Sequence, residues 1–203
     1  MRSVDFYFGL GSRYSYLAFT QLDRIERAQG CCFVLQPLSS VELMRIRGQS
    51  PFQQPPVSGQ YDWRYRKADA EAWATYYGVP YIEPNTLPDG HDHRLLAKAC
   101  WAAHAQGGMR AYCNAIFQAV FVEHQDIGRT LCVQRAGDLG LDVAAFEKTL
   151  DNHGLDQRLT LVTQRAVQRG VFGVPAFLVA DRMFWGNDRL VLLEHYLAGS
   201  RSP

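Results

Sequence analysis

Two kinds of hydrophobic pattern alternate along the 203 residues and predict the order of the elements. Runs of β-branched and aromatic residues at 4–8 and 31–38 predict two buried strands. Between them, apolar residues recur with helical spacing from Tyr14 to Ile25, and Gly30 is a suitable end for that helix. A strand, a helix and a strand in such a short stretch predict a parallel β-α-β unit with a right-handed crossover.

The middle of the chain is predicted to be mostly helical. Residues 39–61 contain Pro51, Pro55 and Pro56, which is too dense in proline for regular structure. After them, helical patterns separated by glycines follow one another at 64–77, 92–106, 108–124, 129–139, 142–152 and 155–169. Such a block is too long for a loop, so it predicts an inserted all-helical domain at 41–154.

Strand patterns return near the end of the chain. Residues 176–180 and 183–185 flank Asp181 and Arg182 as the strands of a short hairpin would, and a closing helix is expected at 188–197. The order β-α-β, helical insertion, α-β-β-α is that of a thioredoxin fold interrupted in its middle. The sequence therefore predicts an α/β fold in which 1–40 and 155–203 form a thioredoxin-like domain.

Composition narrows the classes of partner. The formal net charge is +1 and 20% of residues are charged, which gives no electrostatic reason to expect nucleic acid or a membrane surface. The N-terminus lacks the pattern of a signal peptide, and no apolar run reaches the length of a membrane span. Five cysteines without a C-x-x-C pair indicate reduced thiols, so a cytoplasmic location is expected.

The candidate chemistry lies where the first strand meets the first helix. Gly9-Leu10-Gly11 breaks the strand, and Ser12 falls at or near the first helical turn. Unsatisfied backbone N–H groups at a helix N-terminus stabilise an anion or a nucleophile. A serine there can also be a helix cap and nothing more. A dinucleotide fingerprint fails, because Tyr14 stands where the third glycine would be.

Two motifs near the C-terminus make a third interpretation specific. They are GVFGVPAF at 170–177 and FWGNDRL at 184–190. Together with the opening FYF and SRYSYL segments, they resemble the 2-hydroxychromene-2-carboxylate isomerases and the kappa-class glutathione transferases. These families belong to the DsbA-like branch of the thioredoxin superfamily, and the resemblance in element order covers nearly the whole chain.

The resemblance implies a glutathione site. Redox members of the superfamily open the first helix with C-x-x-C, but here the position begins with Ser12, which would donate a hydrogen bond to the glutathione sulfur. Val174 and Pro175 would form the cis-proline loop, with the Val174 backbone pairing to the cysteinyl unit like an added strand. Asn187 and Asp188, which also suit a helix cap, would hold the γ-glutamyl end.

Several positions depart from the family pattern. The family commonly has Asp at Gly9, Pro at Arg13, Asn at Gln49 and a glutathione-binding Lys at Ser58. Gln49 is retained as a candidate contact to glutathione. We expect Arg13 to supply the cation lost at Ser58, with its guanidinium reaching the glycine carboxylate of glutathione.

The function that the resemblance implies is glutathione-dependent isomerisation of a small aromatic electrophile. For the namesake, this interconverts 2-hydroxychromene-2-carboxylate and trans-o-hydroxybenzylidenepyruvate. A kappa-like transferase that conjugates glutathione to electrophiles is an alternative, because both reactions use the same thiolate. A non-catalytic protein that binds a thiol peptide is another. The family also implies a homodimer, and no metal or nucleotide is needed.

Overall fold

A four-stranded mixed sheet is the centre of the computed structural model, which describes residues 1–48, 62–84 and 90–199. The strands are β1 (Arg2–Phe8), β2 (Cys31–Pro37), β3 (Ala176–Val179) and β4 (Arg182–Trp185), in the order β2-β1-β3-β4. β2 runs parallel to β1, while β3 and β4 form an antiparallel hairpin beside it. The predicted β-α-β unit, the hairpin and the α/β thioredoxin-like class are therefore confirmed.

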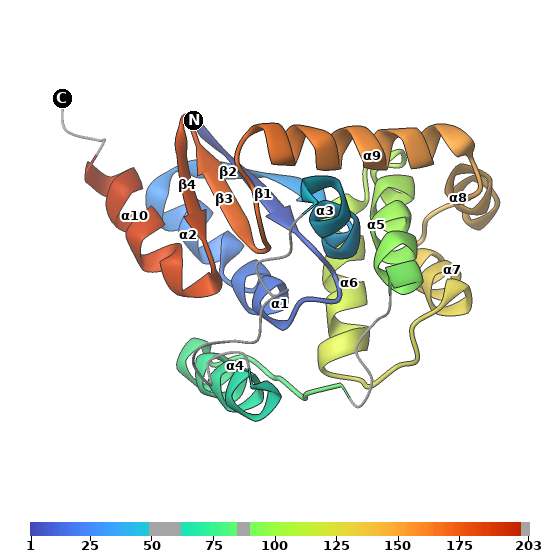
Figure 1. Ribbon diagram of the computed structural model, residues 1–203. Coiled ribbons are helices and arrows are strands. Elements are labelled where there is room, and N and C mark those ends of the chain that lie inside the picture. Colours follow the sequence, from blue (N-terminus) through green and yellow to red (C-terminus); the bar gives the residue numbers. More distant parts are fainter. Residues whose placement is uncertain (49–61, 85–89, 200–203) are drawn as a thin grey trace.

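Helices make up most of the remaining described chain. Apart from the helix at 40–47, their bounds agree with the predicted segments to within a few residues, and the first predicted helix is divided in two. The helices are α1 (Arg13–Phe19), α2 (Leu22–Gln29), α3 (Ser40–Arg47), α4 (Trp63–Tyr77), α5 (Gly90–His104), α6 (Met109–Phe121), α7 (Arg129–Asp138), α8 (Val143–Leu150), α9 (His153–Gln168), the 3₁₀ turn η2 (Asn187–Arg189) and α10 (Leu190–Gly199). Figure 1 shows α9 running across the top, α5 to α8 gathered to the right of the sheet, and α4 below α1.

One stretch was predicted wrongly. Residues 40–47 form the helix α3, although 39–61 was expected to be irregular. Ser39 caps this helix by accepting a hydrogen bond from the Glu42 backbone N–H at 3.3 Å, and Gly48 ends it in the left-handed conformation. The three prolines behind the prediction all lie beyond residue 50, outside the described residues, so they do not interrupt α3.

The sheet is covered on both faces because successive side chains of β1 point to opposite sides. Phe6 stacks on Phe177 with ring centroids 4.7 Å apart, on the face where α2 and α10 pack beside each other. Tyr7 on the opposite face packs with Leu43 of α3 and Ala166 of α9.

The predicted division into two domains stays a prediction. The large cluster of buried apolar residues runs without interruption from β1 into α5, α6 and α8. The predicted boundary at 154/155 falls inside the first turn of α9.

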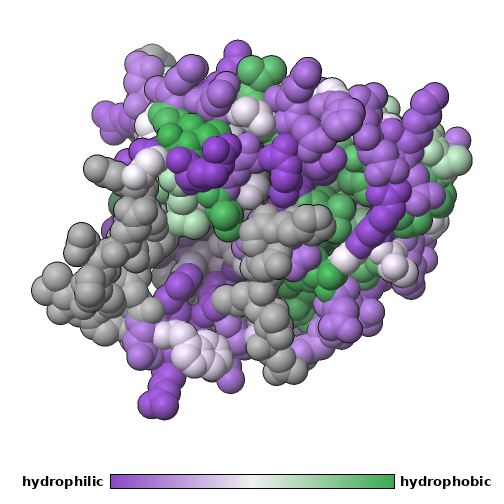
Figure 2. All heavy atoms as spheres, turned by 45° about the vertical axis from the view of Figure 1, so that its right-hand side comes forward, coloured by the Kyte–Doolittle hydropathy of each residue, from purple (hydrophilic) through white to green (hydrophobic). Residues whose placement is uncertain are grey.

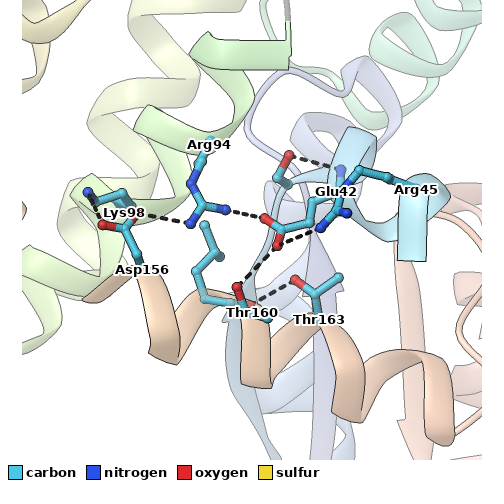
Figure 3. Close-up of polar contacts among 9 residues, drawn as sticks. Glu42, Arg45, Arg94, Lys98, Asp156, Thr160 and Thr163 are labelled. Carbon is cyan, nitrogen blue, oxygen red and sulfur yellow. Dashed lines mark hydrogen bonds and ion pairs between the residues drawn. The ribbon is translucent and has the colours of Figure 1, made fainter. Parts of the chain in front are cut away.

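A network of charged side chains joins α3, α5 and α9, and Figure 3 shows it. Arg94 donates one amino group to Glu42 and the other to Asp156, the latter at 2.9 Å. Lys98 reaches the second oxygen of Asp156 at 3.1 Å, and the Thr160 hydroxyl donates to Glu42 at 3.2 Å. We call these five residues the three-helix network, because they fasten α3 to the helical part of the chain.

Candidate functional site

Four segments meet at one edge of the sheet. Phe8 is paired with Pro37, Tyr7 with Ala176, and Ala176 with Trp185. The carboxyl ends of β1, β2 and β4 and the amino end of β3 therefore lie together. The loop next to each of these strand ends either contains a position singled out from the sequence or leads into the N-terminus of a helix.

The Gly9-Leu10-Gly11 turn carries the chain from β1 into α1. The Ser12 backbone N–H closes the turn by donating to the Gly9 carbonyl at 3.0 Å. The Gly9 N–H donates to the Ser15 hydroxyl oxygen at 3.4 Å, and Ser15 is fully buried. Of the two serines that stand where a C-x-x-C pair would be, Ser15 therefore supports the turn and Ser12 lies at the surface of the site.

Ser12 is the N-cap of α1. Its backbone is extended, and its Oγ accepts a hydrogen bond from the Ser15 N–H at 3.3 Å. A hydroxyl can accept and donate at the same time, and among the described residues Ser12 Oγ donates to no acceptor. The cap interpretation is thus correct, and it leaves the hydroxyl proton available to a ligand.

The loop before β3 faces this turn. The Val174–Pro175 peptide bond is cis, as the resemblance implied. A Cβ built on Gly9 would lie 3.6 Å from Val174 Cγ2, which places the two segments in contact. The Pro175 carbonyl accepts a hydrogen bond from the Gly186 N–H at 2.9 Å and ties the loop to the start of η2.

Asn187 and Asp188 begin η2, directly before α10, as predicted for the start of the closing helix. Asn187 is 3% exposed, its carbonyl accepts from the Tyr77 hydroxyl at 3.1 Å, and its Nδ2 has no hydrogen-bond partner in the described part of the chain. Burial raises the pKa of Tyr77 to about 12, so this phenol keeps its proton and donates. Asp188 is half-buried and lies 3.4 Å from the Arg189 guanidinium.

Arg13 forms a buried ion pair. Its side chain is 4% exposed, and one amino group lies 2.7 Å from Glu83 Oε1. Tyr81 donates to the other oxygen of Glu83. We call these residues the Arg13 triad. Glu83 balances the guanidinium charge inside the protein. The predicted contact of Arg13 with the glycine carboxylate of glutathione stays a prediction.

Comparisons with known proteins identify the family of this fold. A family model for a DSBA-like thioredoxin domain matches residues 3–198. The chain belongs to this family. It is 32% identical over 196 residues to 2-hydroxychromene-2-carboxylate isomerase from Pseudomonas putida, a match that covers 94% of this chain and 92% of that protein. The resemblance to these isomerases is confirmed, and the relatives support an isomerase role.

Solved structures of DsbA-like proteins resemble the whole chain. A structure of 2-hydroxychromene-2-carboxylate isomerase matches with a TM-score of 0.84 at 30% identity, covering 98% of this chain and 95% of the other. The cytosolic disulfide reductase DsbM from Pseudomonas aeruginosa, solved with GSH, matches with a TM-score of 0.62 at 18% identity, covering 97% and 99%. The second match shows the shared DsbA-like fold.

A second polar pair joins α1 to α4 in this DsbA-like domain. The Tyr14 hydroxyl donates to Asp69 Oδ2 at 2.8 Å. Burial, followed by this hydrogen bond and the charge of Asp69, raises the pKa of Tyr14 well above its ordinary value. Tyr14 therefore stays protonated beside Ser12 and holds α4 against the site.

Sequence reasoning missed Glu83 and Tyr81 as parts of this DsbA-like site. Glu83 follows the apolar residues Tyr81 and Ile82, and a carboxylate in such a stretch needs a buried partner. That signal shows that Glu83 is paired, but it does not identify Arg13 as the partner. The contact depends on the hydrogen bond from Ile82 N–H to the Phe121 carbonyl, 2.8 Å long, which fixes the segment against α6.

Two features complete the description of the surface. Gln49 and Ser58 lie outside the described residues, so their predicted roles stay predictions. Figure 2 shows a face mostly covered by hydrophilic side chains, with a hollow in its lower half. Within the described ranges, no three metal-ligating side chains lie together, and no helix is long and apolar enough to cross a membrane.

Proposed function

We propose that the chain is a glutathione-dependent isomerase of aromatic acids of the 2-hydroxychromene-2-carboxylate type, and that Ser12 stabilises the glutathione thiolate. One observation carries this proposal. A serine with an unused hydroxyl proton caps α1 at the sheet edge where the cis Val174–Pro175 loop and Asn187 meet. The substrate class is that in the names of the relatives, and a neighbour of the same fold was solved with GSH.

Ser12 is suited to hold a thiolate. Its hydroxyl can donate to sulfur while its lone pair continues to cap the Ser15 N–H. The first turn of α1 adds a partial positive charge, worth about 0.3–1 kcal/mol for an anion at such an end. The absence of cysteine at this position removes disulfide exchange there, so the reactive sulfur must come from a bound thiol.

The other residues at the edge fit the remaining parts of glutathione. The backbone of Val174 is the proposed partner of the cysteinyl unit, next to Pro175. Asn187 Nδ2 is a buried donor without an acceptor among the described residues, and the γ-glutamyl carboxylate would supply one. Asp188 would bind the γ-glutamyl ammonium. Gln49 remains a proposed contact that the described residues do not include.

When bound, glutathione would supply a nucleophilic thiolate for reversible addition to the electrophilic carbon, which would make the adjacent double bond a rotatable single bond without consuming glutathione. Ser12 holds the sulfur in its charged form before addition and after departure. Val174 and Asp188 orient the tripeptide, so the thiol reaches the carbon without a random search. Tyr14, which keeps its proton, belongs to the first turn of α1 and follows Ser12 by two residues.

The test is an isomerase assay that also counts glutathione. The proposal expects interconversion of 2-hydroxychromene-2-carboxylate and trans-o-hydroxybenzylidenepyruvate that needs glutathione and leaves its concentration constant. Stoichiometric loss of glutathione with formation of a conjugate would instead establish a transferase. A wild-type protein that binds no glutathione at millimolar concentration would overturn both enzymatic interpretations in favour of a non-catalytic binding protein.

A further inference from the structure

The guanidinium of Arg13 has an unusual position for a charged group. Arg13 is the first residue of α1 and follows Ser12 directly. Its side chain and that of Glu83 are each 4% exposed, and the pair is joined by a 2.7 Å contact through Nη2. Tyr81 donates to the far oxygen of Glu83 and so completes the surroundings of that carboxylate.

One amino group of this guanidinium has no hydrogen-bond acceptor in the described chain. Nη1 of Arg13 is shielded from water and has no hydrogen-bond partner among the described residues. A buried donor without an acceptor costs about 1–3 kcal/mol, and buried polar groups in folded proteins are seldom left so. The arrangement therefore points to an acceptor oxygen that the described chain does not provide.

The three-helix network shows what kind of acceptor fits. Arg94 binds two carboxylates at once, Glu42 through one amino group and Asp156 through the other. Arg13 has the same fork with one carboxylate in place. A planar carboxylate is the partner that an arginine fork matches in shape and charge, and its hydrogen bonds are stronger in surroundings that exclude water.

Two carboxylates could accept from Arg13, that of the aromatic substrate and the glycine carboxylate of glutathione. The direction of the Arg13 side chain favours the first. It points to residues 79–84, which are fixed to α6 by the Ile82–Phe121 hydrogen bond. The proposed seats of glutathione, Val174 and Asn187, lie next to the sheet, directly before β3 and after β4.

Two aromatic rings pack against Tyr81, one member of the triad. Tyr16 stacks with Phe121 at 5.3 Å between centroids and with Tyr81 at 6.3 Å, and Tyr81 stacks with Phe121 at 6.0 Å. An aromatic acid suits such surroundings better than the glycine end of a peptide does. The Arg13 triad thus places a donor for a carboxylate next to a cluster of aromatic rings.

We propose that Arg13, through Nη1, binds the carboxylate of the aromatic electrophile. This inference rests on the proposed function and adds the residue that selects acids over neutral analogues. Glu83 and Tyr81 are positioning residues in it, since they hold the guanidinium and make no proposed contact with the substrate.

The experiment measures binding without turnover. Calorimetry is carried out with γ-glutamyl-2-aminobutyryl-glycine present, a glutathione analogue with a methyl group in place of the thiol. The titrants are trans-o-hydroxybenzylidenepyruvate and its carboxamide. We expect Arg13→Met to weaken binding of the acid about 30-fold and of the amide less than about threefold, as expected for loss of a charge-assisted hydrogen bond. Arg94→Met is the matched control and should change neither.

Two further variants keep the test decisive if Arg13→Met fails to fold because Glu83 becomes a buried charge without a partner. Arg13→Lys retains a cation for Glu83 but loses the fork, and Arg13→Met with Glu83→Gln removes both charges together. Each should lower the preference for acid over amide. An unchanged preference in the variants that fold would overturn the inference.

Titrations of the tripeptide itself and of its glycyl amide separate the remaining outcomes. If Arg13→Met weakens the tripeptide but not its glycyl amide, Arg13 serves glutathione and the inference is wrong. If the wild type binds the tripeptide and shows no preference for the acid, the inference fails while the proposed function stands. Failure of the wild type to bind the tripeptide at millimolar concentration would contradict the proposed function itself.

Discussion

Two regions of this protein are built from the same parts and end up with different capacities. Near the sheet edge, Ser12 caps α1 and is followed by the Arg13 triad. In the three-helix network, Ser39 caps α3 and Glu42 of that helix is bound by Arg94. Each region has a serine cap, an arginine, a glutamate and a hydroxyl that donates to that glutamate.

The difference lies in what remains unused. Both amino groups of Arg94 have carboxylate partners. Arg13 has one partner and one buried donor without any, and the Ser12 hydroxyl proton is also unused within the described chain. The comparison teaches that the parts alone do not make a site. Unsatisfied donors near a helix N-terminus distinguish the proposed ligand site from the network that fastens helices together.

The largest expected effect concerns the two glutamates. Glu83→Gln removes the charge that compensates a fully buried guanidinium and should lower the free energy of unfolding by about 3 kcal/mol. Glu42→Gln should cost about half as much, because Arg94 is 35% exposed and keeps Asp156 as a partner. Urea unfolding of both variants checks this. Equal losses would show that burial does not separate the two regions.

The two serine caps should differ in activity and agree in stability. Ser12→Ala should lower kcat/KM about 100-fold, a typical loss for one donor to a developing or stabilised anion. Ser39→Ala should leave kcat/KM within about twofold, while each loses about 1 kcal/mol of stability as a cap. Steady-state kinetics with thermal unfolding on the same samples would refute the assignment if both serines affected activity alike.

The hydroxyl donors give a smaller contrast. Tyr81→Phe and Thr160→Val each remove one hydrogen bond to a buried glutamate, and each should cost about 1 kcal/mol. Tyr81→Phe should also loosen the position of Arg13, so the preference for acid over amide should fall while that of Thr160→Val stays at the wild-type value. A Tyr81→Phe protein with an unaltered preference would remove Tyr81 from the positioning role.

The smallest contrast is in pH dependence. The pKa of Tyr77 is raised by burial to about 12, so its contribution to stability is complete below its ordinary pKa and is lost as pH rises toward 12. Burial alone would raise the pKa of Asp156, but hydrogen bonds from Lys98 and Arg94 lower it, so its contribution is lost as pH falls. Thermal unfolding should be less alkali-sensitive in Tyr77→Phe and less acid-sensitive in Asp156→Asn. The reverse pattern would contradict the assignment of these groups.

The strands and the position of Ser12 could be predicted because their signals are local. An apolar run followed by Gly9-Leu10-Gly11 describes a strand, a turn and a helix start within a dozen residues. The helix α3 also had a local signal, the capping pattern of Ser39 and Glu42 followed by Gly48, which the nearby prolines obscured. The helix was missed because the prolines were given more weight than the capping pattern.

The partner of Arg13 could not be predicted from local patterns. Glu83 meets Arg13 because the segment after α4 is fixed against α6, and that packing is a property of the whole helical part. The same holds for Asn187, whose sequence context suits a helix cap and whose buried amide is a consequence of Tyr77 packing over it. Contacts made by distant segments decide which polar atoms stay unsatisfied, and these atoms define the candidate site.

The most direct test of the central claim is a glutathione titration of the wild type and of Ser12→Ala, followed by thermal shift and by the ultraviolet absorbance of the thiolate. The account predicts that the wild type binds glutathione and ionises its thiol near neutral pH. It predicts that Ser12→Ala still binds the tripeptide, through Val174 and Asn187, with the thiolate signal strongly diminished. An equal thiolate signal in the two proteins would show that Ser12 is a helix cap and no more.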